Sequence, residues 1–106
     1  MRLMAEAISD SSTAEKMERA VSAGQAKLLQ PKPSGPLWNE TSGFFTAHSE
    51  TTTQVFTDSL YGEMLSHHMF NGTVMVDKGV LLRHLAYEWQ ENQDKYGMRV
   101  LSSPIQ

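Results

Sequence analysis

The chain has 106 residues, of which 40% are hydrophobic and 20% are charged, and its net charge is -3. This length holds one modest hydrophobic core and excludes a second domain, and the balance of apolar and charged residues is that of a folded globular protein. Nine Lys and Arg residues against twelve Asp and Glu residues argue against a nucleic-acid partner, and the lack of cysteine excludes disulfides and thiolate chemistry.

The first residues do not form a secretory leader, because Glu6, Ser9 and Asp10 interrupt the apolar run that a leader needs. No apolar stretch approaches the roughly 20 residues of a membrane-spanning helix. We therefore expect a chain that does not cross a membrane and lies in the cytoplasm or at the periphery of a membrane.

Two helices are predicted before the first proline. Residues 1–8 have a helical pattern that ends at the polar run 10–13, whose side chains favour caps and turns. Ser12 and Glu15 have the spacing of a capping box, so a second helix is expected to begin there and to end before Pro31. Apolar positions at helical spacing predict one buried face on this helix, formed by Met17, Val21, Gly24 and Leu28.

The middle of the chain is predicted to hold a connector, a small hairpin and a loop. Three prolines make residues 30–36 a connector, because proline lacks the amide hydrogen that a helix needs. Two short extended pieces, residues 37–38 and 44–47, flank a turn and indicate a β-hairpin. The polar residues 48–54 are rich in threonine and are expected to form a loop.

A third helix is predicted to begin at Thr57 or Asp58, either of which can cap it, and to end before Asn71-Gly72, a pair that suits a turn with positive φ. Its apolar residues cover more sides than three neighbouring helices would bury. This excess implies a missing partner surface.

A fourth helix is predicted from Lys78 to about Asn92, with Asp77 as its cap. Its apolar row at i, i+4 spacing is formed by Leu81, Leu85 and Trp89. Residues 94–106 are expected to be irregular or extended. The short first helix and the apolar residues 98–105, which have no element to pack against, predict that residues 1–106 are a single incomplete segment of a larger domain.

Four motifs in the chain resemble one family of glycoside hydrolases, and they read Leu37-Trp38-Asn39-Glu40, Gly43-Phe44-Phe45, Thr57-Asp58-Ser59-Leu60-Tyr61-Gly62-Glu63 and His67-His68. The family is that of the non-lysosomal glucosylceramidases, also called bile-acid β-glucosidases, and the resemblance covers about residues 1–104. It implies a mainly α fold, a six-hairpin (α/α) toroid, of which this chain supplies about two helical hairpins plus a short β-hairpin. Residues 1–8 and 58–70 would then belong to inner helices, and residues 13–29 to an outer one.

The resemblance implies a parent enzyme of the glucosylceramidase type that hydrolyses β-glucosides and that needs no cofactor. Its partners would be that substrate and the remainder of the toroid, and this segment would be inactive alone. One residue departs from the family pattern, because relatives typically have Gln where this chain has Glu63. The role of this residue therefore stays open.

No catalytic residue is assigned within the chain. A retaining glycosidase needs two carboxyl groups about 5 Å apart. Asp58 and Glu63, five residues apart on the expected helix, would diverge by more than a right angle, so they do not form such a pair. In the family that the chain resembles, the catalytic Glu and Asp lie upstream of the matching segment, and no position here matches them.

Three residues are candidates for substrate binding: Asp58, Tyr61 and His67. In a toroid, Asp58 would lie where an inner helix begins and faces the central cavity, and its carboxylate would accept hydrogen bonds from sugar hydroxyls. Tyr61 and His67 would line the same cavity. The alternatives are a helix cap for Asp58 and core packing for the other two side chains.

Neither a metal nor a cofactor is predicted. His67, His68 and His84 do not contain the pair of histidines four residues apart that is typical of helical zinc sites. Asn39 and Asn71 each begin an Asn-X-Thr glycosylation pattern, which we interpret as turn chemistry. The alternative to an enzyme segment is a small helical interaction module, in which the second and fourth helices form a docking surface.

Overall fold

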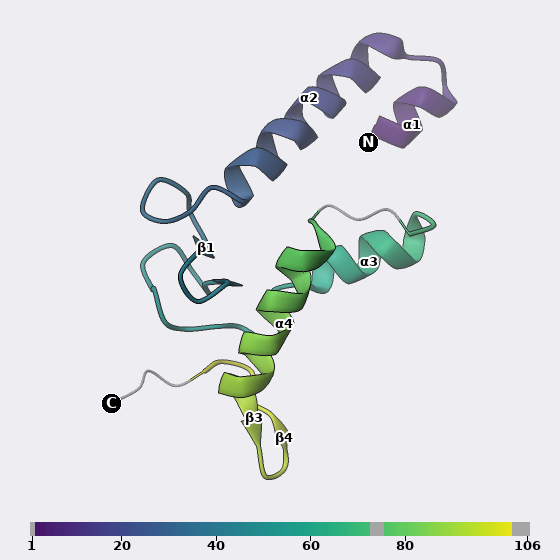
Figure 1. Ribbon diagram of the computed structural model, residues 1–106. Helices are drawn as coiled ribbons and strands as arrows, with labels where there is room; N and C mark the ends of the chain where they lie inside the picture. The colour runs from purple at the N-terminus through teal and green to yellow at the C-terminus, as the bar shows by residue number, and fades with distance from the viewer. Residues whose placement is uncertain (1, 73–75, 103–106) are drawn as a thin grey trace.

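The computed structural model describes residues 2–72 and 76–102. Within that part of the chain, four helices and two short hairpins follow one another (Figure 1), namely α1 Arg2–Ala7, α2 Ser11–Leu28, β1 Trp38–Asn39, β2 Phe44–Phe45, α3 Tyr61–Met69, α4 Lys78–Asn92, β3 Gln93–Asp94 and β4 Gly97–Met98. About half of the chain is helical, and all the strand pairs are antiparallel. The expectation of a mainly α fold is therefore confirmed in part.

Helix α2 is capped by a different residue from the one predicted. The carboxylate of Asp10 accepts a hydrogen bond from the Thr13 amide at 3.0 Å, and this bond lowers the pKa of the carboxyl group. Ser12 already lies inside the first turn, so the predicted capping box with Glu15 is wrong. Helix α1 packs against α2, and Arg2 pairs with Glu18 between them.

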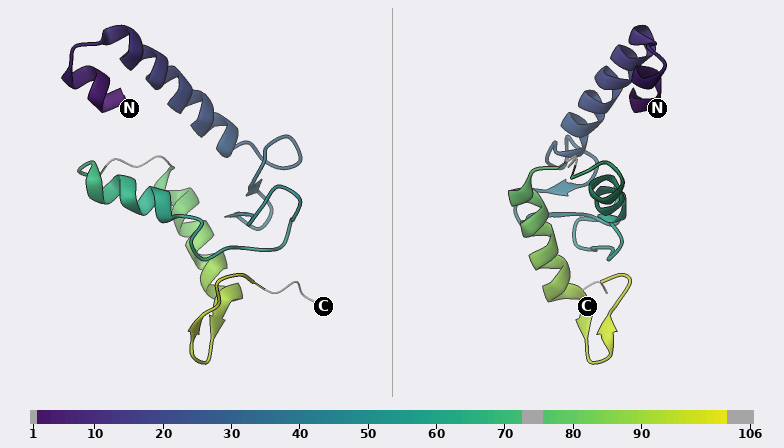
Figure 2. Two further views of the ribbon diagram at one scale, coloured as in Figure 1. Left: turned by 180° about the vertical axis from the view of Figure 1, so that it is seen from behind. Right: turned by 90° about the vertical axis from the view of Figure 1, so that its right-hand side faces the viewer.

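The predicted buried face of α2 is also absent from this structure. None of the residues of α2 is buried, and Val21 in the middle of the predicted face is 41% exposed. Figure 2 shows why, because α1 and α2 extend away from the β1–β2 hairpin, and α4 lies on the other side of it. Helix α2 has the pattern of a packed helix, but only α1 and the core contact at Leu28 cover part of its apolar face.

The small core lies around the β1–β2 hairpin, which the sequence predicted correctly. Trp38 pairs with Phe45 across the two strands, and their rings lie 4.9 Å apart between centroids. These two residues form the core with Val76. The partly buried hydrophobic residues that pack against them are Leu28, Leu29, Leu37, Leu60, Val80 and Leu81.

The turn of this hairpin is fastened to α4 by Glu40 and Arg83. Glu40 accepts a hydrogen bond from the indole of Trp38 at 2.5 Å, and the Arg83 guanidinium donates to the Glu40 carbonyl at 2.8 Å. Gly43 has φ +75°, and a Cβ atom there would lie 2.6 Å from Nε of Arg83. Only glycine fits this turn without displacing the arginine.

Helix α3 begins later than predicted, at Tyr61. Its N-cap is Leu60, and no side chain caps it, so the predicted cap at Thr57 or Asp58 is wrong. The end of the helix agrees with the prediction, because Asn71 and Gly72 follow it with φ of 54° and 83°. No residue of α3 is buried.

Helix α4 has the predicted bounds and the predicted cap, because Asp77 accepts a hydrogen bond from the Gly79 amide at 2.7 Å. Of its predicted apolar row, only Leu81 packs against the core, whereas Leu85 is 47% and Trp89 is 61% exposed. The buried residues of α4 are instead His84, Glu88 and Asn92. After α4, the predicted extended tail forms the β3–β4 hairpin, in which Gln93 pairs with Met98 and Asp94 with Gly97.

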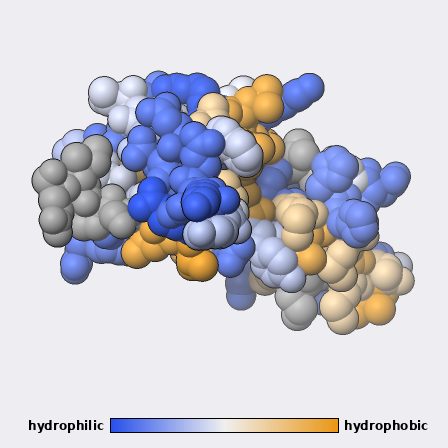
Figure 3. Space-filling view, turned by 90° about the horizontal axis from the view of Figure 1, so that it is seen from below, coloured by the Kyte–Doolittle hydropathy of each residue, from blue (hydrophilic) through white to orange (hydrophobic). Residues whose placement is uncertain are grey.

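The molecule is more extended than a compact domain of its length. Its radius of gyration is 16.1 Å, whereas a compact chain of about 100 residues has roughly 13 Å. Large apolar side chains lie exposed on all four helices. In the view from below, apolar residues gather on the side where Figure 1 draws α1 and α3 (Figure 3). Among the residues that the structure describes, no helix is both long enough and apolar enough to span a bilayer.

The capping of α2 can be tested with a pair of alanine variants. We expect Asp10→Ala to lower the helix content of the chain, because the Thr13 amide loses its acceptor. Ser12→Ala is the matched control, since Ser12 contributes no cap, and it should leave the helix content unchanged. Far-ultraviolet circular dichroism measures both. A larger loss with Ser12→Ala would restore the predicted capping box.

Candidate functional site

A groove of about 640 Å³ lies between α3, α4 and the loop that precedes α3. This volume is in the range of small-molecule sites, about 300–1,000 Å³. Apolar side chains form most of its walls, and carboxylates lie among them. The residues that line it are Thr57, Asp58, Leu60, Tyr61, Glu63, Met64, His67, Leu81, Leu85 and Glu88.

The structure places all three predicted substrate-binding residues, Asp58, Tyr61 and His67, in this groove. Tyr61 is 56% exposed and His67 is also exposed, so neither side chain is packed in a core. Asp58 lies in the loop before α3, and its side chain caps no helix. In this structure Asp58 therefore caps no helix and neither of the other two side chains is packed in a core, and the part of all three in binding remains a prediction.

Glu63 and Asp58 both line the groove. They do not lie on one helix as expected, because α3 begins only at Tyr61 and Asp58 lies in the loop before it. One carboxylate oxygen of Glu63 accepts a hydrogen bond of 3.5 Å from the Val76 amide.

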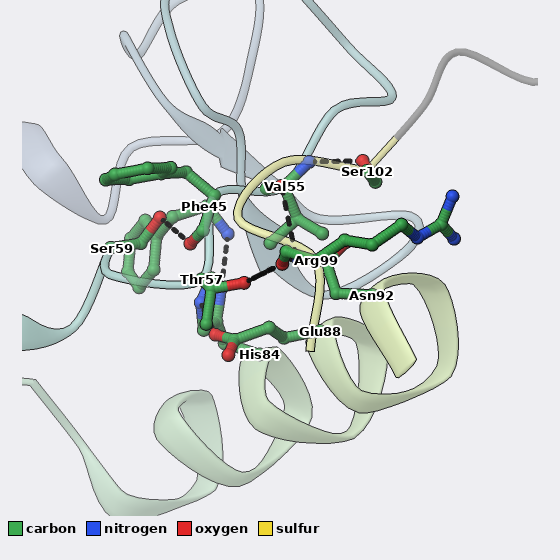
Figure 4. Close-up of polar contacts among 10 residues, drawn as sticks. Phe45, Val55, Thr57, Ser59, His84, Glu88, Asn92, Arg99 and Ser102 are labelled. Carbon is green, nitrogen blue, oxygen red and sulfur yellow. Dashed lines mark hydrogen bonds and ion pairs between the residues drawn. The ribbon is translucent and has the colours of Figure 1, made fainter. Parts of the chain in front are cut away.

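The loop that carries Asp58 is held in place by the end of the chain. The amide of Val55 donates to the Ser102 hydroxyl at 2.9 Å, and the Val55 carbonyl accepts from the Ser102 amide at 3.0 Å. The Thr57 amide donates to the carbonyl of Val100 at 2.9 Å. Figure 4 shows these two segments side by side above α4. The entry to α3 is thus fixed by residues more than 40 positions later.

Asn92 at the end of α4 holds the same loop from below. Its side-chain amide donates to the Thr57 hydroxyl at 2.8 Å and to the Val55 carbonyl at 3.4 Å. Asn92 is fully buried. A buried amide is costly unless it is hydrogen-bonded, so these contacts orient both the loop and the helix.

His84 joins α4 to the β1–β2 hairpin. It is fully buried, and its Nδ1 accepts a hydrogen bond of 3.0 Å from the Phe45 amide. Burial lowers the pKa of His84 from 6.5 to about 4, so the ring is neutral at pH 7. Because Nδ1 is the acceptor, the single proton of the neutral ring is on Nε2.

Glu88 lies between His84 and the groove. Its Oε2 atom is 3.3 Å from Nε2 of His84, but neither atom has a hydrogen bond of good geometry among the described residues. Burial raises the pKa of Glu88, and the negative charge of Asp58 raises it further. The contact with His84 is therefore not an ion pair, since the ring is neutral.

Sequence reasoning missed the row of His84, Glu88 and Asn92. The three residues are spaced by four along α4, which is the signal of one helix face. A polar row of this kind is ordinarily the solvated face of an amphipathic helix. Its burial depends on acceptors and donors of the hairpin and the loop, which are distant in the sequence.

The histidines of α3 give no metal centre. Glu63 lies four residues before His67 and shares the groove with it, which is a helical spacing that metal sites use. Among residues 2–72 and 76–102, however, no group of three or more His, Cys, Asp or Glu side chains is placed to hold an ion.

The titration of His84 can be followed by NMR. We expect its ring to titrate near pH 4 rather than near 6.5, because burial disfavours the charged form. The unfolded chain binds this proton near pH 6.5, so the contribution of His84 to stability is complete above that pH and is lost as the pH falls toward about 4. Glu88 changes the stability in the opposite direction. Because its pKa is raised in the folded chain, the folded state becomes less stable as the pH rises and the carboxyl group ionises.

The NMR signals of the His84 ring nitrogens measure the pKa of the ring directly, and the amide resonance of Phe45 provides a second measure. Both should change together below pH 5, because a proton on Nδ1 removes the acceptor of that amide. His84→Phe is the assignment control. A midpoint near 6.5 with an unchanged Phe45 amide would contradict the buried neutral ring.

Comparisons of the chain with protein-family models, with curated proteins and with solved structures find no match.

Proposed function

We propose that the chain is part of the helical toroid of a glycoside hydrolase that acts on β-glucosides, of the non-lysosomal glucosylceramidase type. In this proposal the chain supplies about two helical hairpins and the β1–β2 hairpin, and the parent enzyme supplies the catalytic pair. The chain alone is inactive. The proposal starts from the motifs of the sequence, which run from Leu37 to His68.

The observation that carries the proposal is the exposure of α3. This helix has no buried residue, although most of its side chains other than the two histidines are apolar or aromatic. Its exposed large side chains are Tyr61, Met64, Leu65 and Met69, with Phe70 directly after it. An exposed apolar surface of this kind usually marks a contact with another protein surface. An inner helix of a toroid would have its neighbours on these sides.

The groove supports the same proposal by its position. Asp58 lies at the amino end of α3, and Tyr61 and His67 lie on the helix itself. In a toroid this end would face the central cavity, where carboxylates accept hydrogen bonds from sugar hydroxyls and aromatic rings cover apolar sugar faces. These three residues are proposed to contact the substrate without taking part in bond cleavage.

The function can be tested on the natural protein. An antibody against the chain should capture from its source cells a polypeptide longer than 106 residues that hydrolyses a fluorogenic β-glucoside. A mechanism-based β-glucoside inactivator should label a carboxylate of that polypeptide outside the present sequence, because retaining enzymes form a glycosyl-enzyme. Captured protein of 106 residues without hydrolysis, or a label on Asp58 or Glu63, would contradict the proposal.

The exposed side chains of α4 favour a second candidate, the helical interaction module. Leu82, Leu85 and Trp89 form an outward apolar surface that fits a docking face. In that case the chain would be a cooperative monomer with its own stable core. The glycosidase proposal instead leaves several helices without their neighbours.

Behaviour in solution distinguishes the two candidates. If the chain is a toroid segment, we expect it to bind a hydrophobic dye strongly and to self-associate as its concentration rises, because its apolar helix faces lack partners. Light scattering and dye fluorescence measure both properties. Leu85→Glu places a charge on the exposed face of α4 and should reduce both signals, whereas Gln90→Glu is the matched control on the polar side. A cooperative monomer that binds no dye would favour the module.

A further inference from the structure

The groove between α3 and α4 contains an excess of negative charge. Three carboxylates line it, those of Asp58, Glu63 and Glu88, and its lining includes no Lys or Arg. The other ionisable side chains of the lining are Tyr61 and His67. Nothing in the lining carries the permanent positive charge that would offset the carboxylates.

Asp58 and Glu88 both line this groove. Burial raises the pKa of Glu88, and the negative charge of Asp58 raises it further. Asp58 has no hydrogen bond or ion pair through its carboxylate among the described residues. Glu88 is 7% exposed, and its Oε2 atom is buried without a hydrogen-bond partner there. This Oε2 atom faces Nε2 of His84 at 3.3 Å, so a cation in the groove would act by offsetting the negative charge of the two carboxyl groups.

The walls of the groove define the rest of the ligand. Leu60, Met64, Leu81 and Leu85 line the groove together with the carboxylates, and Tyr61, which is 56% exposed, lines it as well. An apolar body would remove this surface from water, and an aromatic face attracts a cation that lies over it. A bare metal ion would use none of these contacts, and no group of three ligating side chains is present in the described chain.

We propose that the groove between α3 and α4 binds an organic cation with an apolar body, such as an alkylammonium ion, with its charge between Asp58 and Glu88 and its apolar part against Leu60, Met64 and Leu85. This site does not depend on the glycosidase proposal, because it rests on the charges and walls of the groove alone.

Three probes of equal length test the charge. Hexylammonium, 1-hexanol and hexanoate share one apolar body and differ only in the head group. Isothermal titration of the 106-residue chain, at concentrations where sedimentation shows a monomer, should give about tenfold tighter binding of hexylammonium than of hexanol, and no measurable binding of hexanoate. High salt should weaken the binding of hexylammonium and leave that of hexanol unchanged.

Variants locate the site. Asp58→Asn should remove most of the preference for hexylammonium and keep the affinity for hexanol, and Glu88→Gln should act in the same direction. Asp58 is exposed, so its variant is informative even if the buried Glu88 variant fails to fold. Glu50→Gln removes an exposed charge of loop 48–54, outside the groove, and is the matched control. Equal affinity for hexylammonium and hexanol, or an equal effect of Asp58→Asn and Glu50→Gln, would overturn the proposal.

Discussion

The buried polar row of α4 determines how the rest of the chain is arranged. His84 accepts a hydrogen bond from the Phe45 amide, and Asn92, two turns later, donates to the loop at Val55 and Thr57. Leaving such buried groups without partners would cost roughly 1–3 kcal/mol each, so only one rotation of the helix about its axis satisfies both ends. That rotation places Glu88 in the lining of the groove and leaves Leu85 and Trp89 of the neighbouring apolar row exposed. The exposed apolar face is thus a consequence of the polar contacts.

The residues of the first two sequence motifs, 37–40 and 43–45, have structural roles in this molecule. Trp38 fills the core, Glu40 binds both its indole and Arg83 of α4, and Gly43 leaves room for that arginine. Together they hold the hairpin against the helix that carries His84. The other two motifs supply most of the groove lining, including Asp58, Tyr61, Glu63 and His67, and α4 supplies Glu88 and two leucines. The first two motifs therefore bear on the local fold, whereas the chemistry of the groove is argued from the carboxylates and walls that line it.

Local signals in the sequence predicted local structure well. The bounds of α4, its Asp77 cap, the β1–β2 hairpin and the positive φ of Asn71 and Gly72 all follow from contacts within a few residues. The orientation of α4 did not follow, because apolar periodicity favours burial of Leu85 and Trp89, whereas the amide of Phe45 and the loop at Val55 select the polar face. The sequence predicted that Asp58, Tyr61 and His67 lie together. It did not predict that Glu88 joins them, because the place of Glu88 in the groove depends on how α4 is rotated about its axis.

The pairing of Ser102 with Val55 has a consequence for how the molecule forms. These two residues are 47 positions apart, so closing their contact costs much more chain entropy than forming α4 or the hairpin. A growing chain on the ribosome can complete α4 before residues 99–102 have been made. Until they emerge, the loop at Asp58 lacks one of its two supports. The groove between α3 and α4 therefore gains the second support of its entrance loop only when residues 99–102 have been made, although its lining residues are synthesised earlier.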